Sequence, residues 1–132
     1  MANVAPDIRT RRSGGGWSVQ EHVGHLADLE PLWTGRLDDF EAGAATLRPA
    51  DLTIRATWEA RHNSRPLSEL LEAFRTRRGN LVARVEAMSE AELSLTALHP
   101  RLQQPVTVVD QLFFVAEHDD HHLASITRLL RH

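Results

Sequence analysis

The chain has 132 residues, with 15 basic and 18 acidic side chains that give a formal net charge of −3. This length suits one domain with one hydrophobic core, and without a basic excess the chain lacks the charge pattern that binds a nucleic-acid backbone. The absence of cysteine excludes disulfides, thiolate catalysis and cysteine-ligated zinc, so any metal would need nitrogen and oxygen ligands.

Residues 1–16 are predicted to be a leader or a truncated first helix, which ends in a run of glycines. They lack the hydrophobic run of a signal peptide, and no apolar stretch of the chain is long enough to span a membrane. We therefore expect a cytoplasmic protein without a membrane partner.

A long helix is predicted near residues 18–40. Ser18 followed by Glu21 is typical of a capping box, which satisfies two otherwise unpaired amides at a helix start. Apolar residues then recur at helical spacing. Pro31 should kink this helix near Ala27, because the proline ring clashes with the carbonyl four residues back.

The remainder of the chain is also helical in pattern. Residues 44–66 predict a connection with a short helical turn around Trp58, followed by a helix over 67–88, a short helix over 89–95 and a final helix over 107–130. We find no convincing strand and no internal repeat. The predicted class is all-α, an antiparallel bundle with one long connection.

Histidine carries the strongest chemical signal, with eight in the chain. His118 and His122 are four residues apart and therefore share one face of the last helix, where two imidazoles could hold one ion. Their alternative role is structural, and a metal site needs at least one more ligand from elsewhere. His121 points about 100° away from His122 and is the weaker candidate.

The first long helix offers His22 and His25 as a third ligand. Helical periodicity does not choose between them, and either could instead be a core-edge histidine that hydrogen-bonds to the backbone. The other histidines are predicted to lie outside any site. His99, before a proline, is expected in a loop, and His62 and His132 on the surface.

Two segments resemble the motifs of the DinB-like family. The segment 17–28, WSVQEHVGHLAD, is similar to its first motif, and the segment 117–126, EHDDHHLASI, to its closing His-x-x-x-His motif. His99-Pro100 and the spacing from Phe74 to Arg78 also fit. The resemblance covers roughly residues 17–130, and we assign 17–132 to one bundle domain.

The resemblance implies a four-helix bundle that holds a divalent metal through His25, His118 and His122. Zinc is expected first, with nickel or iron as alternatives. His22 then occupies a usually apolar position and would line the pocket. Asp28 matches a frequent family acid, expected on the helix surface or beside a ligand.

The implied function is that of an enzyme acting on a small molecule. Relatives include metal-dependent hydrolases and bacillithiol- or mycothiol-dependent enzymes, so a hydrolase and a thiol-dependent transferase are both expected, the latter with a low-molecular-weight thiol as cosubstrate. The alternatives are a non-catalytic metal-containing stress-response or binding module, and a helical interaction domain with structural histidines. No general base stands out among the carboxylates near the histidines in sequence, namely Glu21, Asp28, Glu30 and Glu117.

One departure from the family concerns the first helix, which is usually complete before the tryptophan motif. Here sixteen residues precede Trp17, so we expect that helix to be short or missing. The loss of one helix would leave part of an apolar stripe uncovered, and we therefore expect a two-fold homodimer.

Overall fold

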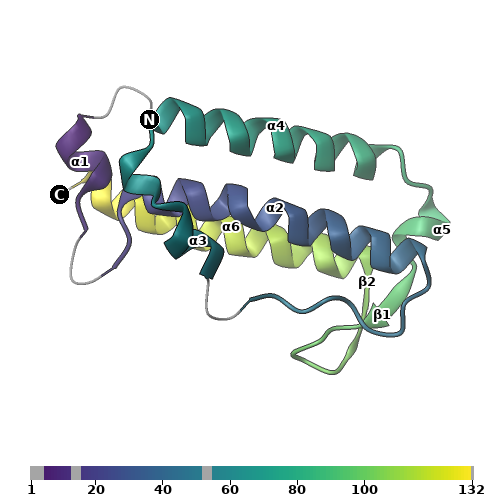
Figure 1. Ribbon diagram of the computed structural model, residues 1–132. Coiled ribbons are helices and arrows are strands. Elements are labelled where there is room, and N and C mark those ends of the chain that lie inside the picture. The colour runs from purple at the N-terminus through teal and green to yellow at the C-terminus, as the bar shows by residue number, and fades with distance from the viewer. Residues whose placement is uncertain (1–4, 13–15, 52–54, 132) are drawn as a thin grey trace.

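The computed structural model describes residues 5–12, 16–51 and 55–131. Three long helices lie side by side and form the body of the molecule (Figure 1): α2 (Val19–Glu41), α4 (Leu67–Glu86) and α6 (Val108–Leu130). The short helix α1 (Pro6–Thr10) contacts α2 and α6. These helices confirm the predicted all-α bundle with a short first helix.

The shorter elements lie in the connections. They are α3 (Arg55–Ala60), the 3-10 helix η1 (His62–Ser64), α5 (Glu90–Leu93), β1 (Thr96–Leu98) and β2 (Pro105–Thr107). The predicted helical turn around Trp58 corresponds to α3, and the predicted short helix over 89–95 to α5.

Three of the helix starts follow directly from local sequence. Ser18, Ser89 and Thr107 each accept a hydrogen bond from the third residue of the helix that follows, whose own side chain accepts from the capping residue's backbone N–H. Such caps contribute roughly 0.5–2 kcal/mol each. The starts of α2, α5 and α6 are therefore set by residues within one turn.

The long connection decides the direction of the helices. It brings the start of α4 back beside the start of α2, where the Gln20 side-chain amide donates to the carbonyls of His62 and Arg65. At the other end of both helices, Arg84 of α4 pairs with Asp38 of α2. Thus α2 and α4 run parallel, and only α6 has the predicted antiparallel direction, as the colours in Figure 1 show.

Helix α2 continues through Pro31. Proline has no N–H to donate to the carbonyl of Ala27, one turn earlier. Arg77 of α4 supplies the missing donor, with its Nη1 2.8 Å from that oxygen. The proline predicted to kink the helix thus frees an acceptor that α4 uses.

The prediction of no strands was wrong. Strands β1 and β2 form an antiparallel hairpin in which Ala97 pairs with Val106. Leu98 also exchanges backbone hydrogen bonds with Ala45 and Leu47 in the long connection. Each strand has three residues, too few for an alternating pattern to be recognised.

The apolar core has two parts. The larger lies at the carboxyl end of α2 and is built around Trp33, Leu37, Phe40, Leu81 and Val115. The smaller joins the starts of α2 and α4 to the end of α6. The histidines lie between these two parts. None of the described helices is long and apolar enough to cross a membrane.

Candidate metal centre

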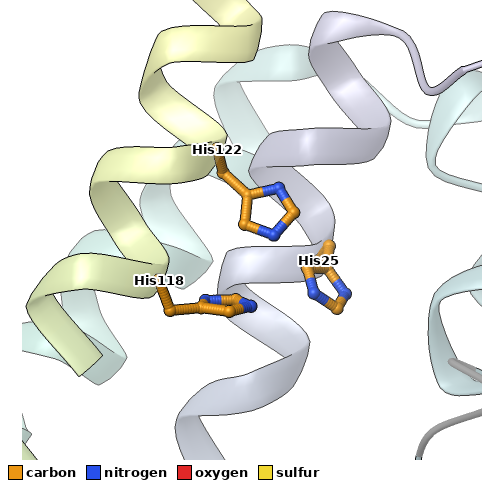
Figure 2. Close-up of side chains that lie close together, drawn as sticks. All are labelled: His25, His118 and His122. Atoms are coloured by element: carbon orange, nitrogen blue, oxygen red, sulfur yellow. The ribbon is translucent and has the colours of Figure 1, made fainter. Parts of the chain in front are cut away.

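Three histidines from two helices converge inside the bundle. His25 projects from α2 and His118 and His122 from α6, and one ring nitrogen of each lies within 4.8 Å of the others. Figure 2 shows the three rings turned toward a common point. His25 and His122 are buried and His118 is half-buried. The structure therefore brings together the three residues that the family resemblance selected.

Helix geometry explains this convergence. His118 and His122 lie one turn apart on the face of α6 that packs on α2, and their ring centroids are 4.5 Å apart. His25 faces both across the helix pair, at 5.4 Å from His118 and 4.8 Å from His122. One spacing in the sequence and one helix–helix contact are enough to assemble the group.

A chain of polar contacts orients His25. Its Nδ1 lies 2.9 Å from the hydroxyl of Thr57, which donates to Asp28 Oδ2 at 3.3 Å. Because that hydroxyl proton is used toward Asp28, Thr57 accepts from an Nδ1–H of His25. His25 then keeps Nε2 as its free electron pair, the form in which a neutral imidazole binds a metal.

His122 is oriented by a second histidine. Its Nδ1 lies 2.8 Å from Nδ1 of His22, which is buried as well. If Nδ1 of His122 carries the proton and donates to His22, Nε2 of His122 is the atom free for an ion. His22, expected to line the pocket, lies behind His122 instead.

His118 differs from the other two. Within the described residues its Nδ1 is buried and has no hydrogen-bond partner. Its ring packs edge-on against Trp33, with centroids 5.8 Å apart. The ring is held by packing, whereas His25 and His122 are held by hydrogen bonds.

Burial favours the neutral form of these histidines. It lowers the pKa of His25 to about 4 and that of His122 to about 3, and the neighbouring imidazoles add to both shifts. Burial also lowers the pKa values of His118 and His22. Neutral rings are the state that a metal ion requires, because a protonated imidazole cannot bind one.

His62 corrects a prediction. It was expected on the surface, but it is 2% exposed and lies against Gly24. A Cβ at Gly24 would lie 2.2 Å from the His62 ring, so only glycine fits there. His62 Nε2 lies 2.8 Å from Asp28 Oδ2, which links η1 to the acid that orients His25 through Thr57.

The remaining histidines lie outside the group of three. His99 follows β1 in a loop, as predicted, but it is buried. His121 is exposed on α6. His132 lies outside the described residues.

Most of the carboxylates considered as general bases form other contacts or are exposed to solvent. Glu21 caps α2 and pairs with Arg12, and Glu30 pairs with Arg78. Glu117 is exposed on α6. Of the four carboxylates, only Asp28 is linked by hydrogen bonds to one of the three histidines.

A cavity of about 520 Å³ opens beside the group. His25 and His118 form part of its wall, with Leu29, Leu32, Trp33 and Phe114 as apolar neighbours. This volume suits a small organic molecule. A ligand in the cavity would lie directly against two of the three histidines.

The donor set fits a divalent metal. Zinc–nitrogen bonds are about 2.0–2.1 Å long, so nitrogens within 4.8 Å of one another need only small ring movements to share one ion. The chain offers no thiolate, and imidazole suits zinc, nickel and iron. Two rings already have their second nitrogen paired, as metal-binding histidines usually do.

Sequence reasoning missed two residues of this region, Thr57 and His62. Both lie within the connection 44–66, where periodicity gives no indication of which side chains turn inward. The signal for His62 was Gly24, a glycine inside a helix that otherwise favours residues with side chains.

Known proteins are similar to this chain in sequence and in structure. A protein of Bacillus pumilus (strain SAFR-032) named "Putative metal-dependent hydrolase" is 29% identical over 119 residues, which cover 89% of this chain. The chain spans 66% of the length of that curated relative.

Two solved structures share the fold. YfiT from Bacillus subtilis, described as a probable metal-dependent hydrolase with an unusual four-helix bundle topology, is 24% identical and superposes with a TM-score of 0.81, covering 97% of this chain and 74% of its own. A mycothiol-dependent maleylpyruvate isomerase is 16% identical with a TM-score of 0.70, covering 91% of this chain and 50% of its own. The model of the DinB superfamily matches residues 5–126, and this chain therefore belongs to the DinB superfamily.

Proposed function

We propose that this chain is a metal-dependent enzyme that acts on a small molecule, as a hydrolase or a thiol-dependent transferase, with His25, His118 and His122 as its metal ligands. The observation that carries the proposal is the convergence of three imidazole nitrogens within 4.8 Å beside a cavity of about 520 Å³. Zinc is the first choice of metal, and nickel and iron follow.

Three protein ligands leave a coordination position open, which distinguishes a catalytic metal site from a closed structural one. A bound metal would supply Lewis acidity at this position, which activates a nucleophile and polarises a substrate atom. The ligands themselves are fixed by their outer contacts. Thr57 and Asp28 orient His25, and His22 orients His122.

The cavity walls provide the surface on which a substrate would bind. Leu29, Leu32, Trp33 and Phe114 give an apolar surface that excludes water and holds the body of a substrate. Electrostatic effects are stronger in such an environment than in water.

The thiol-dependent alternative is supported by the similarity in fold to the mycothiol-dependent isomerase. This chain has no cysteine, so a reacting thiol would have to come from a separate cosubstrate. Hydrolysis needs only water as the second reactant and is supported by the names of the other relatives.

The test begins with elemental analysis of the purified protein, for which we expect about one divalent metal ion per chain. The metal-loaded and the chelator-treated protein are then assayed on a panel of esters, amides and electrophiles, with and without low-molecular-weight thiols. Turnover that requires metal supports an enzyme, and a requirement for thiol identifies the transferase. Full metal occupancy without turnover of any substrate would favour the non-catalytic binding module.

We also propose that the protein is cytoplasmic and forms a homodimer. The apolar stripe expected to be partly uncovered was that of Val19 to Leu37 or that of Leu67 to Met88, and the residues of both are buried or half-buried within the chain. Support for a dimer therefore comes from α6. There Val109 and Phe113 lie one turn apart and are 55% and 65% exposed. Light scattering should give the mass of two chains, and Phe113→Ser should lower it to one. A wild-type mass of one chain would contradict the dimer.

A further inference from the structure

The far end of the cavity has a different chemistry from the end that holds the histidines. Arg36 lies in its wall, and Arg101 and His99 lie beside it on the hairpin connection. Arg36 is 2% exposed, so its guanidinium has lost nearly all contact with water. A buried cation normally lies against a carboxylate, because its desolvation is otherwise uncompensated.

Arg36 has no such partner among the described residues. Its Nε donates to the carbonyl of Arg48 at 3.0 Å, and its Nη1 reaches Gln111 Oε1 only at 3.4 Å. The negative charge that acts on the pKa of Arg36 is that of Asp39. Both oxygens of that carboxylate already accept hydrogen bonds from Arg48. Its two hydrogen bonds are therefore to neutral oxygens, and its guanidinium also lies over the Trp33 ring, 5.7 Å from the ring centroid.

The neighbours of Arg36 increase the positive character of this end. Burial lowers the pKa of Arg36, and the charge of Arg101 adds to that shift. His99 accepts backbone N–H groups from Arg101 and Leu102 on its Nδ1, at 3.2 Å each. A neutral His99 must therefore carry its proton on Nε2, and this buried donor has no partner within the described residues.

One acid also lies in the cavity wall. Asp51 is exposed, and its Oδ2 accepts from the backbone N–H of Arg55. A single carboxylate against two guanidinium groups leaves the cavity with an excess of positive charge.

The spacing along α2 fits a ligand that reaches both ends. His25 and Arg36 are eleven residues apart, about three turns, and lie on the same face of the helix with Leu29, Leu32 and Trp33 between them. The separation along the axis is about 16 Å. An elongated molecule could place one end at the histidines and the other at the arginine, with its body over the apolar residues.

From this arrangement we infer that the cavity takes an amphipathic organic anion, whose acidic group lies against Arg36 with Arg101 and His99 nearby, and whose apolar body lies over Leu29, Leu32 and Trp33. The inference rests on the proposed function for the chemistry at the histidine end, because there the reacting bond of such a molecule would lie. Guanidinium groups bind carboxylates and phosphates in the same forked geometry, so both acids belong to the class.

The test compares octanoate with its neutral analogue octanamide, by chemical-shift titration of the protein in the metal-free and the metal-loaded state. We expect octanoate to bind about tenfold more tightly than octanamide in both states. Arg36→Gln should abolish this preference. Arg75→Gln, which removes an exposed arginine of α4 outside the cavity, should leave it unchanged.

The metal-free arm separates the two ends of the cavity. A preference that exists only with metal and survives Arg36→Gln would place the carboxylate at the ion and overturn the inference. Equal binding of octanoate and octanamide by the wild-type protein would overturn it as well. Metal content of the Arg36→Gln protein is measured separately, so loss of the anion site is distinguishable from failure of the metal proposal.

Two further arms cover folding and ligand class. If circular dichroism shows that Arg36→Gln does not fold, Arg101→Gln replaces it and should reduce the preference for octanoate severalfold, since it removes the second cation; no reduction would count against the site. Octyl phosphate is titrated in parallel. Tighter binding of octanoate indicates a carboxylate ligand, and tighter binding of octyl phosphate indicates a phosphate ester.

Discussion

The two halves of α2 bury side chains of different character. The first half buries Gln20, Glu21, His22 and His25 among its apolar residues, whereas the second half presents Trp33, Leu37 and Phe40 to the larger core. Each buried polar group of the first half has a hydrogen-bond partner, as burial requires. The first half of α2 therefore carries the hydrogen-bonded histidines, whereas the second half packs mainly apolar side chains around one buried cation, Arg36.

The largest effect is expected from removing one ligand of the histidine group to which the first half of α2 contributes His25. His122→Ala should release most of the metal, because two remaining histidines seldom hold zinc tightly by themselves. We expect affinity to fall by more than about 100-fold, measured by competition with a chelating dye. His121→Ala, which removes the exposed neighbour, should keep the metal. Equal metal content in the two variants would reject the assignment.

A substitution in the second half of α2 should lower the stability of the fold. Leu37 is 1% exposed, and Leu37→Ala should cost about 2–5 kcal/mol of unfolding free energy through lost burial and a residual cavity. Urea unfolding measures this change, and Leu123→Ala on the exposed side of α6 is the matched control, with an expected change near 0.5 kcal/mol. If both variants lose the same stability, the contrast between core and surface does not hold.

Mild acid should act on the buried histidines that the first half of α2 faces. The folded-state pKa of His25 is about 4 against an ordinary value of 6.5, so between these pH values the unfolded chain takes up a proton that the folded chain does not. The contribution of His25 to the unfolding free energy of the metal-free protein should therefore be fully present above about pH 6.5 and be lost as the pH falls toward 4. His25 alone should account for on the order of 3 kcal/mol.

Urea unfolding of metal-free protein at a series of pH values checks this prediction. His25→Phe, which removes the titrating ring, should show a shallower fall over the same range. An identical slope in wild type and variant would mean that other groups cause the acid sensitivity.

The smallest effect should come from the contacts around a ligand. Thr57→Val keeps the shape of the side chain and removes the hydroxyl between His25 and Asp28. Metal affinity should fall by about tenfold, because the ring loses the acceptor that sets its orientation. Thr76→Val on the exposed face of α4 is the control. If Thr57→Val binds metal as tightly as the control, this hydroxyl does not orient the ligand.

Elements that depend on neighbours in sequence could be predicted, and those that depend on distant partners could not. The starts of α2, α5 and α6 were predicted correctly because Ser18, Ser89 and Thr107 bond within their own first turn. The hairpin was missed because Ala97 pairs with Val106 and Leu98 bonds to the connection after α2, and no local preference specifies these contacts.

The candidate site divides in the same way. The pair His118 and His122 could be recognised from its spacing, since four residues place two side chains on one helical face whatever surrounds the helix. Arg36 gave no signal, because a single arginine on a helix is normally exposed. Its burial follows from the packing of the hairpin connection and the segment after α2, neither of which has a periodic pattern.

By itself, then, the sequence determined that α6 carries two histidines on one face and that the class is an all-α bundle. Periodicity left open whether His22 or His25 completes the group, since the two lie about 60° apart around the axis of α2 and both fit an inward face. The family resemblance favoured His25, and the packing of α6 against α2 decides the geometry. It turns His25 toward both rings and sets His22 behind His122, because a helix face acquires a direction only when another element lies against it.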